Sequence, residues 1–185
     1  MATRTQVTRA DIEHVADDAN GRHEIIDGEL VVSPAPGLRH ARALMAIVDV
    51  LRAWTRVHGG EVVHGPFELY ISEARSLIPD ALLMLERHRE RLDDRYLRLP
   101  PDLVVEVSSS RDSRSRDLGP KRQIYARFGV PEYWVADLDD GAILAFRLDG
   151  DRYLDAVRHS PDAVLTTPLL PGFAAPVADL LAHTS

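Results

Sequence analysis

The most constraining feature of the sequence is the run Asp102–Val107, DLVVEV, which Pro100-Pro101 precedes. Apart from its two acids the run is apolar, and it is short, as is typical of a strand buried inside a sheet. A helical segment over Asp117–Phe128 follows and stops at Gly129. The next run, Glu132–Asp137 (EYWVAD), again has the composition of a strand. A strand, a helix and a strand in this order favour a layered fold of sheet and helix.

The segments on either side extend this pattern. Asp27-Gly28 lies between two strand-like runs, His23–Asp27 and Glu29–Ser33, and is a strong signal for a β-hairpin. The sequence therefore predicts an α/β (α+β) domain with a mixed central β-sheet flanked by helices, an N-terminal β-hairpin and a C-terminal β-meander. The remaining expected elements are a helix over Leu38–His58, strands over Glu61–His64, Phe67–Ile71 and Ile78–Leu85, meander strands over Ala142–Leu148 and Arg152–Val157, and a terminal helix over Val177–His183.

Length and composition bound the kind of protein. At roughly 100–200 residues per domain, the 185 residues predict one domain over 1–185, with residues 1–20 as a polar lead-in that contains a short helix, Thr8–Ala16. The absence of cysteine excludes disulfides, thiolate zinc sites, iron–sulfur clusters and cysteine nucleophiles. No apolar run approaches the ~20 residues that span a bilayer. The polar, acidic start resembles no signal or transit peptide, so we expect a cytoplasmic protein.

The net charge of −7 argues against a protein that coats nucleic acid without specificity. The charge is nevertheless unevenly distributed, because residues 75–127 hold 12 basic and 9 acidic side chains. This basic middle is either a surface that faces phosphate or the solvated side of arginine-rich loops. Charge alone favours the second interpretation.

Two acids interrupt apolar runs that are expected to be buried. Asp80 lies in LIPDALLML and Glu106 lies in DLVVEV. A buried carboxylate is costly unless it is paired, hydrogen-bonded or bound to a metal. Either acid alone is best explained as pointing to solvent at a strand end. The two together, on consecutive strands, favour a shared site, and alternation places Glu106 on the same face as Val104.

Lys121 is the only lysine among 22 basic side chains. Arginine and lysine differ where a compact point charge is required. At 100° per residue Lys121 falls near the centre of the apolar stripe formed by Leu118, Ile124, Tyr125 and Phe128. A lysine on an inward face must either extend out to water or meet an acid, and Glu106 is on the preceding strand.

Three further residues have weaker claims. His40 begins the long helix in line with its apolar stripe, and on its own is best interpreted as a core histidine. Glu29 follows the hairpin turn and could reach a site on the sheet, whereas Glu24 is better explained as a strand-edge charge.

Other catalytic motifs are missing from the sequence. It has no HExxH, no GxSxG and no glycine-rich phosphate loop, and its eight histidines lack the spacing of zinc ligands. Ser108–Ser110 is best interpreted as a loop that caps the following helix. A site built from carboxylates and a backbone carbonyl would suit Mg²⁺ or Mn²⁺.

Pro79-Asp80, Glu106 and a basic residue resemble the signature of the PD-(D/E)XK restriction-endonuclease-like superfamily. More closely, a set of segments resembles the Uma-two family of candidate restriction endonucleases. They extend from about His23 to Leu148 and are specific only as a set: EIIDGEL, IPDALLML, PDLVVEVSSSR, KRQIYARFGVPEYWVAD and the FRL near Phe146. The superfamily lysine usually follows the glutamate by two positions, where this chain has Ser108. The Uma-two family places it on the next helix, where Lys121 stands.

The resemblance implies a restriction-endonuclease-like core and metal-dependent hydrolysis of phosphodiester bonds in DNA. Asp80 and Glu106 would bind Mg²⁺ or Mn²⁺, with the backbone carbonyl of Val107 as a third ligand. Lys121 would orient the attacking water or offset charge on the phosphate. His40 and Glu29 are second-rank candidates for positioning the metal or the water.

Two other functions stay open on the sequence. One is a relative that kept the fold as a metal- or nucleic-acid-binding module and lost turnover. The other is a structural or interaction protein, such as a dimer built through the meander, whose buried ions are only architectural. A homodimer would also suit a nuclease, because cutting two strands suits two symmetric sites.

Overall fold

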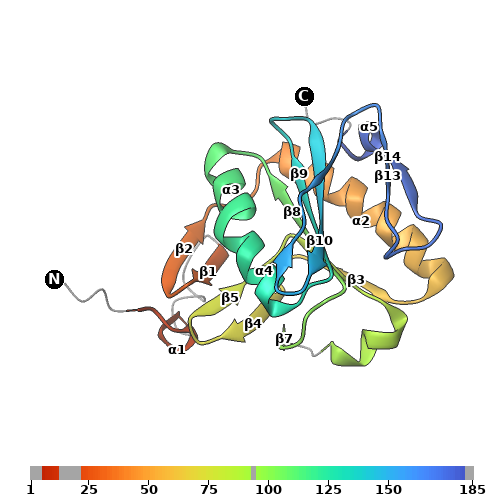
Figure 1. Ribbon diagram of the computed structural model, residues 1–185. Coiled ribbons are helices and arrows are strands. Elements are labelled where there is room, and N and C mark those ends of the chain that lie inside the picture. Colours follow the sequence, from red (N-terminus) through yellow and green to blue (C-terminus); the bar gives the residue numbers. More distant parts are fainter. Residues whose placement is uncertain (1–5, 13–21, 93–94, 182–185) are drawn as a thin grey trace.

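The computed structural model describes residues 6–12, 22–92 and 95–181. A large mixed sheet forms its centre, with strand order β11-β10-β9-β8-β6-β3 and β12 beside β10 (Figure 1). Strands β8 and β9 are parallel, and the other pairs in this sheet are antiparallel. Its strands are β3 (Glu61–His64), β6 (Ala81–Met84), β8 (Leu103–Ser108), β9 (Glu132–Asp137), β10 (Ala142–Asp149), β11 (Arg152–Tyr153) and β12 (Val157–His159).

A small sheet packs beside the large one, with strand order β2-β1-β5-β4-β7. The predicted hairpin is its edge, and the turn residues Asp27 and Gly28 have the positive φ angles, 51° and 80°, that a two-residue hairpin turn needs. Its strands are β1 (Arg22–Ile26), β2 (Glu29–Ser33), β4 (Glu68–Ser72), β5 (Arg75–Leu77) and β7 (Tyr96–Leu97); β13 (Val164–Thr166) and β14 (Ala174–Pro176) form a separate pair.

Helices cover both faces of the large sheet (Figure 1). On one face α2 packs its apolar stripe against alternate residues of β6, β8 and β9. On the other face α4 and the small sheet bury the intervening residues. The helices are α1 (Arg9–Ile12), α2 (Leu38–His58), η1 (Glu86–Arg91), α3 (Arg111–Arg116), η2 (Asp117–Lys121), α4 (Arg122–Phe128) and α5 (Val177–Leu180). Among the described residues, no helix combines the length and apolar character required to cross a bilayer.

The expectation of one strand over Ile78–Leu85 is wrong. Strand β5 ends at Leu77 in the small sheet and β6 begins at Ala81 in the large one. Pro79 has no N–H to donate to a ladder, so the chain leaves one sheet before it and joins the other after it. Asp80 therefore stands at the junction between the two sheets.

The expectation of one helix over Asp117–Phe128 is also wrong at its start. The helical region begins at Arg111, where Ser110 forms a capping box with Ser113, so the serine loop does cap the helix. Gly119, with φ −103° and ψ −106°, and Pro120 then kink the chain between α3 and α4. The kink directly precedes Lys121.

The other predicted elements agree closely with the structure. The bounds predicted for α2, β2, β3 and β9 are those observed. The meander is present, although its last strand is divided into β11 and β12, which both pair with β10. The β13–β14 pair has no counterpart among the predicted elements. Within the predicted helices Thr8–Ala16 and Val177–His183, residues 13–16 and 182–183 lie outside the described residues.

We predict that Leu51→Ala lowers the free energy of unfolding by about 2–5 kcal/mol, because it leaves a cavity where α2 meets the sheet. Leu51 is fully buried there. Val57→Ala on the same helix is the control, since Val57 is 79% exposed. Urea unfolding measures both variants. Equal stability of the two would contradict the packing of α2 described above.

Candidate active site

Asp80 and Glu106 come together at the end of the β6–β8 pair. The register pairs Ala81 with Val105, and extending it by one residue sets Asp80 opposite Glu106. The backbone N–H of Val107 donates to Oδ2 of Asp80 at 2.7 Å. Since the N–H and C=O of one strand residue point to the same edge, the Val107 carbonyl points to that edge as well.

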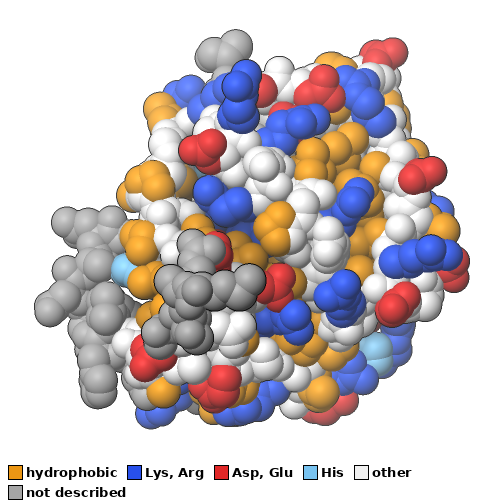
Figure 2. All heavy atoms as spheres, turned by 60° about the vertical axis from the view of Figure 1, so that its left-hand side comes forward, with side chains coloured by type: hydrophobic (Ala, Val, Ile, Leu, Met, Phe, Trp, Pro, Cys, Tyr) orange, Lys and Arg blue, Asp and Glu red, His pale blue; other side chains and the backbone are white. Residues whose placement is uncertain are grey.

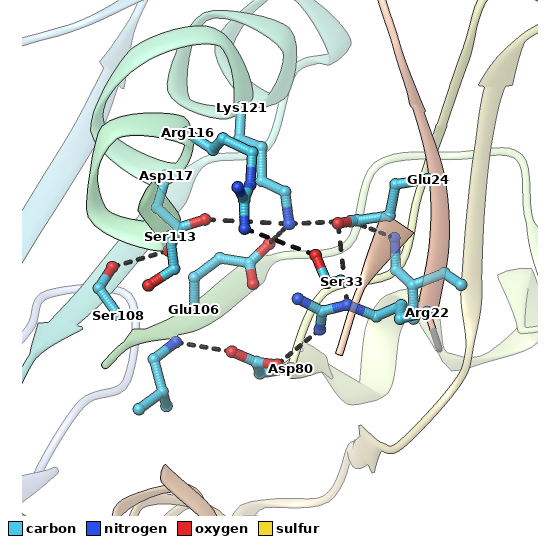
Figure 3. Close-up of polar contacts among 12 residues, drawn as sticks. Arg22, Glu24, Ser33, Asp80, Glu106, Ser108, Ser113, Arg116, Asp117 and Lys121 are labelled. Carbon is cyan, nitrogen blue, oxygen red and sulfur yellow. Dashed lines mark hydrogen bonds and ion pairs between the residues drawn. The ribbon is translucent and has the colours of Figure 1, made fainter. Parts of the chain in front are cut away.

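Asp80 has two further partners from different elements, of which Arg22 is drawn in Figure 3. Nη1 of Arg22, on β1, donates to Oδ1 at 2.7 Å, and Nε2 of His40, on α2, lies 3.0 Å from Oδ2. Burial alone would raise the pKa of the Asp80 carboxyl. The His40 hydrogen bond and the Arg22 charge outweigh burial and hold that pKa well below its usual range.

Glu106 has an asymmetric environment. Oε1 accepts hydrogen bonds from Nζ of Lys121 at 3.0 Å and from the Tyr125 hydroxyl at 2.7 Å. Oε2 is buried without a hydrogen-bond partner among the residues that the structure describes. Burial raises the pKa of the Glu106 carboxyl to about 8, against the opposing charge of Lys121. The unpartnered oxygen is free to hold a proton or to bind a cation.

Lys121 is almost fully buried and lies between two glutamates. Its Nζ is 2.8 Å from Oε1 of Glu24 and 3.0 Å from Oε1 of Glu106, with Oδ1 of Asp117 at 3.9 Å (Figure 3). Burial alone would lower the pKa of Lys121, but the three carboxylates raise it, so the ammonium stays charged. Glu24 is held in turn by the backbone N–H of Ile78, which donates to its Oε1 at 2.9 Å.

These groups lie at a cavity of about 1050 Å³. Asp80, Lys121, His40, Arg22 and the backbone at Val107 line it, and the wholly buried Glu24 and Glu106 lie behind them. The remaining lining includes the serines before and within α3 and the prolines after β2. Outside the cavity, basic side chains alternate with acidic and apolar ones over the face drawn in Figure 2, which is the pattern of a mixed solvated surface.

The structure brings most of the predicted site residues together. Asp80, Lys121, His40 and Val107 line the cavity, the Val107 N–H donates to Asp80, and Glu106 lies against Lys121 behind the cavity wall. Glu29 does not join them, because it is exposed on β2 beyond the hairpin turn.

Sequence reasoning missed Glu24 and Arg22. The prediction that Glu24 is a strand-edge charge is wrong, since β1 lies between β2 and β5 and Glu24 is wholly buried. A signal was present: period-two alternation puts Arg22 and Glu24 on the same face as Ile26, which is in the core. Arg22 borders Asp80 and Glu24, so both residues of this face belong to the site.

The atoms that could bind a metal at this site are of the type that a divalent cation such as Mg²⁺ prefers. Asp80, Glu106 and the Val107 carbonyl offer only oxygen, which Mg²⁺ and Mn²⁺ prefer. The buried oxygens Oε2 of Glu106 and Oε2 of Glu24 lack hydrogen-bond partners within the described ranges. No group of three or more acidic or histidine side chains in the described part of the chain is, however, already arranged around one ion position. Arg22 and His40 hold the Asp80 oxygens instead.

A solved structure shares the fold of this protein. A solved structure described as "a putative nuclease belonging to DUF820 from Anabaena variabilis" matches with a TM-score of 0.72 and 16% sequence identity. The match covers 88% of this chain and 91% of that chain, and at this identity it shows that the two share a mixed α/β fold. The comparison with curated proteins found no match.

The family itself is shown by sequence. Residues 9–178 match the model of the Uma2 family, which is described as "Putative restriction endonuclease". The chain therefore belongs to the Uma2 family, and the resemblance predicted from its motifs is confirmed.

We predict that Glu106 makes the folded protein less stable as the pH rises. Its pKa is raised from 4.5 to about 8 on folding, so the stability it contributes while protonated is lost progressively as the pH climbs through that window. Wild type and Glu106→Gln, each in a chelator, are compared by urea unfolding across the same window. The stability of wild type relative to the variant should fall, and Glu61→Gln, a change at an exposed acid, should follow wild type. If the free energy of unfolding varied with pH in the same way in wild type and in Glu106→Gln, the result would contradict a raised pKa at Glu106.

Proposed function

We propose that this protein is a metal-dependent endonuclease that hydrolyses phosphodiester bonds in DNA with Mg²⁺ or Mn²⁺. One observation carries the proposal: the only lysine of the chain is buried against Glu106, and Asp80 stands opposite that glutamate at the same cavity. Two acids and a lysine in this arrangement match the residue types expected of a PD-(D/E)XK nuclease. Membership of the Uma2 family supports the same reaction class.

In this proposal Asp80, Glu106 and the carbonyl of Val107 hold the ion. When bound, a divalent cation would act as a Lewis acid on the scissile phosphate and would lower the pKa of a water that it binds. His40 fixes the orientation of the Asp80 carboxylate through its 3.0 Å contact with Oδ2. Tyr125 fixes that of Glu106 through its hydrogen bond to Oε1, which leaves Oε2 available.

Lys121 acts on the reacting phosphate. Lys121 is one of the residues that line the cavity, and its ammonium remains protonated and is held by Glu24 and Glu106, so that its position is set before substrate arrives. A preorganised positive charge of this kind orients the attacking water and offsets the negative charge that develops on the phosphate. Glu24, and not Glu29, is therefore the acid of the hairpin that supports the site, and it does so by holding Lys121.

We propose DNA as the substrate and a homodimer as the active assembly. The cavity lining includes Arg22 and Arg116, and guanidinium groups match phosphate geometry. Cutting both strands of a duplex suits two sites related by symmetry, so we include a homodimer in the proposal.

The test is cleavage of supercoiled plasmid and of single-stranded DNA with Mg²⁺ or Mn²⁺. Wild type should cut, a chelator should stop it, and Asp80→Asn and Lys121→Met should each lower the rate at least about 100-fold, the scale for loss of a preorganised charge. Lys121→Arg is added because it keeps a charge between the glutamates and so preserves folding. It should also be slow, since guanidinium and ammonium place their donors differently.

Arg75→Gln is the matched control. Arg75 pairs with Asp27 on the surface of the small sheet, away from the cavity, and the variant should cut at the wild-type rate.

The products and the variants separate the possible functions. If linear plasmid forms before nicked circles accumulate, the result would support the dimer. Undiminished cleavage in Asp80→Asn would contradict the site. A folded wild type that binds Mn²⁺ without cutting either DNA would favour a binding module, and one that does neither would favour an architectural role for the buried charges.

A further inference from the structure

Arg22 holds one carboxylate oxygen of Asp80, the acid that the proposed function assigns to the metal. Its Nη1 donates to Oδ1 of Asp80 at 2.7 Å, and Oδ2 already accepts from Val107 and faces His40. Both carboxylate oxygens are therefore engaged. Of these partners, only the Arg22 guanidinium carries a permanent positive charge, so it is the group that neutralises Asp80 as a metal ion would.

The Arg22 guanidinium also lies close to the other carboxylates of the site. Its Nε is 3.7 Å from Oε2 of Glu24, and the charges of Glu106, Asp80 and Glu24 all stabilise its protonated form against the cost of burial. Figure 3 shows the guanidinium below the Glu24 carboxylate and beside Asp80. Lys121, by contrast, contacts Glu24 and Glu106 from the side of the helix.

The side chain of Arg22 can leave this position without unfolding its strand. It is 28% exposed and lines the cavity, whereas Lys121 is 1% exposed. The backbone of Arg22 is paired with Ser33 in the hairpin, so the side chain alone has to move. Arg22 is thus the partly exposed cation of the site, and Lys121 is the buried one.

We propose that Arg22 is a displaceable counter-ion: it neutralises Asp80 until a divalent cation binds, and the two compete for Oδ1. The inference rests on the proposed metal-dependent function and adds a positioning residue to it. The competition explains why the acidic side chains that fit an ion in kind are not arranged around one position in the described part of the chain.

Competition of this kind weakens the apparent affinity for the metal. If the site is competent only while Arg22 is away from Asp80, the apparent dissociation constant is the intrinsic one divided by the fraction of time that Arg22 is away. Removing the guanidinium removes that penalty. The gain in affinity on mutation therefore measures how strongly Arg22 holds Asp80.

The first experiment measures Mn²⁺ binding from the electron paramagnetic resonance signal of the free ion, with no DNA present. Arg22→Gln should bind Mn²⁺ at least about tenfold more tightly than wild type, which corresponds to Arg22 being away from Asp80 for about a tenth of the time or less. Thermal unfolding without metal establishes that the variant is folded.

Arg116→Gln is the matched control for a general charge effect. Arg116 lines the same cavity with the same charge, but its hydrogen bond is to the Ser33 hydroxyl at 3.5 Å and it makes no contact with Asp80. Its removal should change Mn²⁺ affinity less than about twofold. An equal gain in Arg22→Gln and Arg116→Gln would overturn the inference, because it would show that net charge and not occupation of Asp80 sets the affinity.

A second experiment observes Arg22 directly in the wild-type protein and does not depend on the folding of a variant. The ¹⁵N resonance of its Nε, assigned by through-bond correlation, should shift on titration with Mg²⁺ in step with binding. The Nε resonance of Arg75, paired far from the cavity, should stay in place. A static Arg22 resonance on saturation with Mg²⁺ would overturn the inference.

The outcomes separate this inference from the proposed function. Equal Mn²⁺ affinity in wild type and Arg22→Gln would refute displacement and leave the metal site standing. No Mn²⁺ binding in wild type but measurable binding in Arg22→Gln would support displacement in its strongest form. No binding in either folded protein would refute the metal site and the inference together.

Discussion

The buried ion pairs of Lys121 are the interaction on which the rest of the site depends. One ammonium joins three parts of the fold, since Glu24 comes from the small sheet, Glu106 from the large sheet and Lys121 itself from the kinked helical region. Burying these charges is tolerable only while they remain paired, because an isolated buried charge costs several kcal/mol. The arrangement therefore fixes how the two sheets meet, and with it the position of Asp80 between them. Stability and site geometry share the same contacts.

The charge balance of the buried ionic cluster at the cavity gives the site its chemical character. Among the described residues, Glu24, Asp80, Glu106 and Asp117 surround two cations, Arg22 and Lys121, so negative charge is in excess. Burial, with the charges of Asp117 and Asp80, raises the pKa of Glu106, and buried oxygens of Glu24 and Glu106 are left without hydrogen bonds within the described ranges. Both features are costly for a purely architectural cluster, and both would be relieved by a divalent cation. This is why we favour a metal-dependent reaction over a structural role.

Much of this arrangement follows from sequence pattern. The apolar runs predicted β8 and β9, and the helical period predicted that Lys121 faces inward. One acid in each of two consecutive apolar runs indicated that Asp80 and Glu106 meet. The pattern could not show that Pro79 passes the chain from one sheet to the other, because a local run carries no information on which strand will be its neighbour. For the same reason Glu24 was taken for an edge charge: its burial depends on β5 pairing with β1, a contact between residues about fifty positions apart. The role of Arg22 depends on that same pairing.

The most direct test of a metal site at Asp80 and Glu106 is anomalous diffraction from crystals grown with Mn²⁺. The account predicts one manganese peak bounded by the Asp80 and Glu106 carboxylates and the Val107 carbonyl, with Lys121 still paired to Glu24 and the Arg22 guanidinium moved away from Asp80. A crystal that contains Mn²⁺ at saturating concentration, shows no peak between these acids and keeps Arg22 on Asp80 would contradict it.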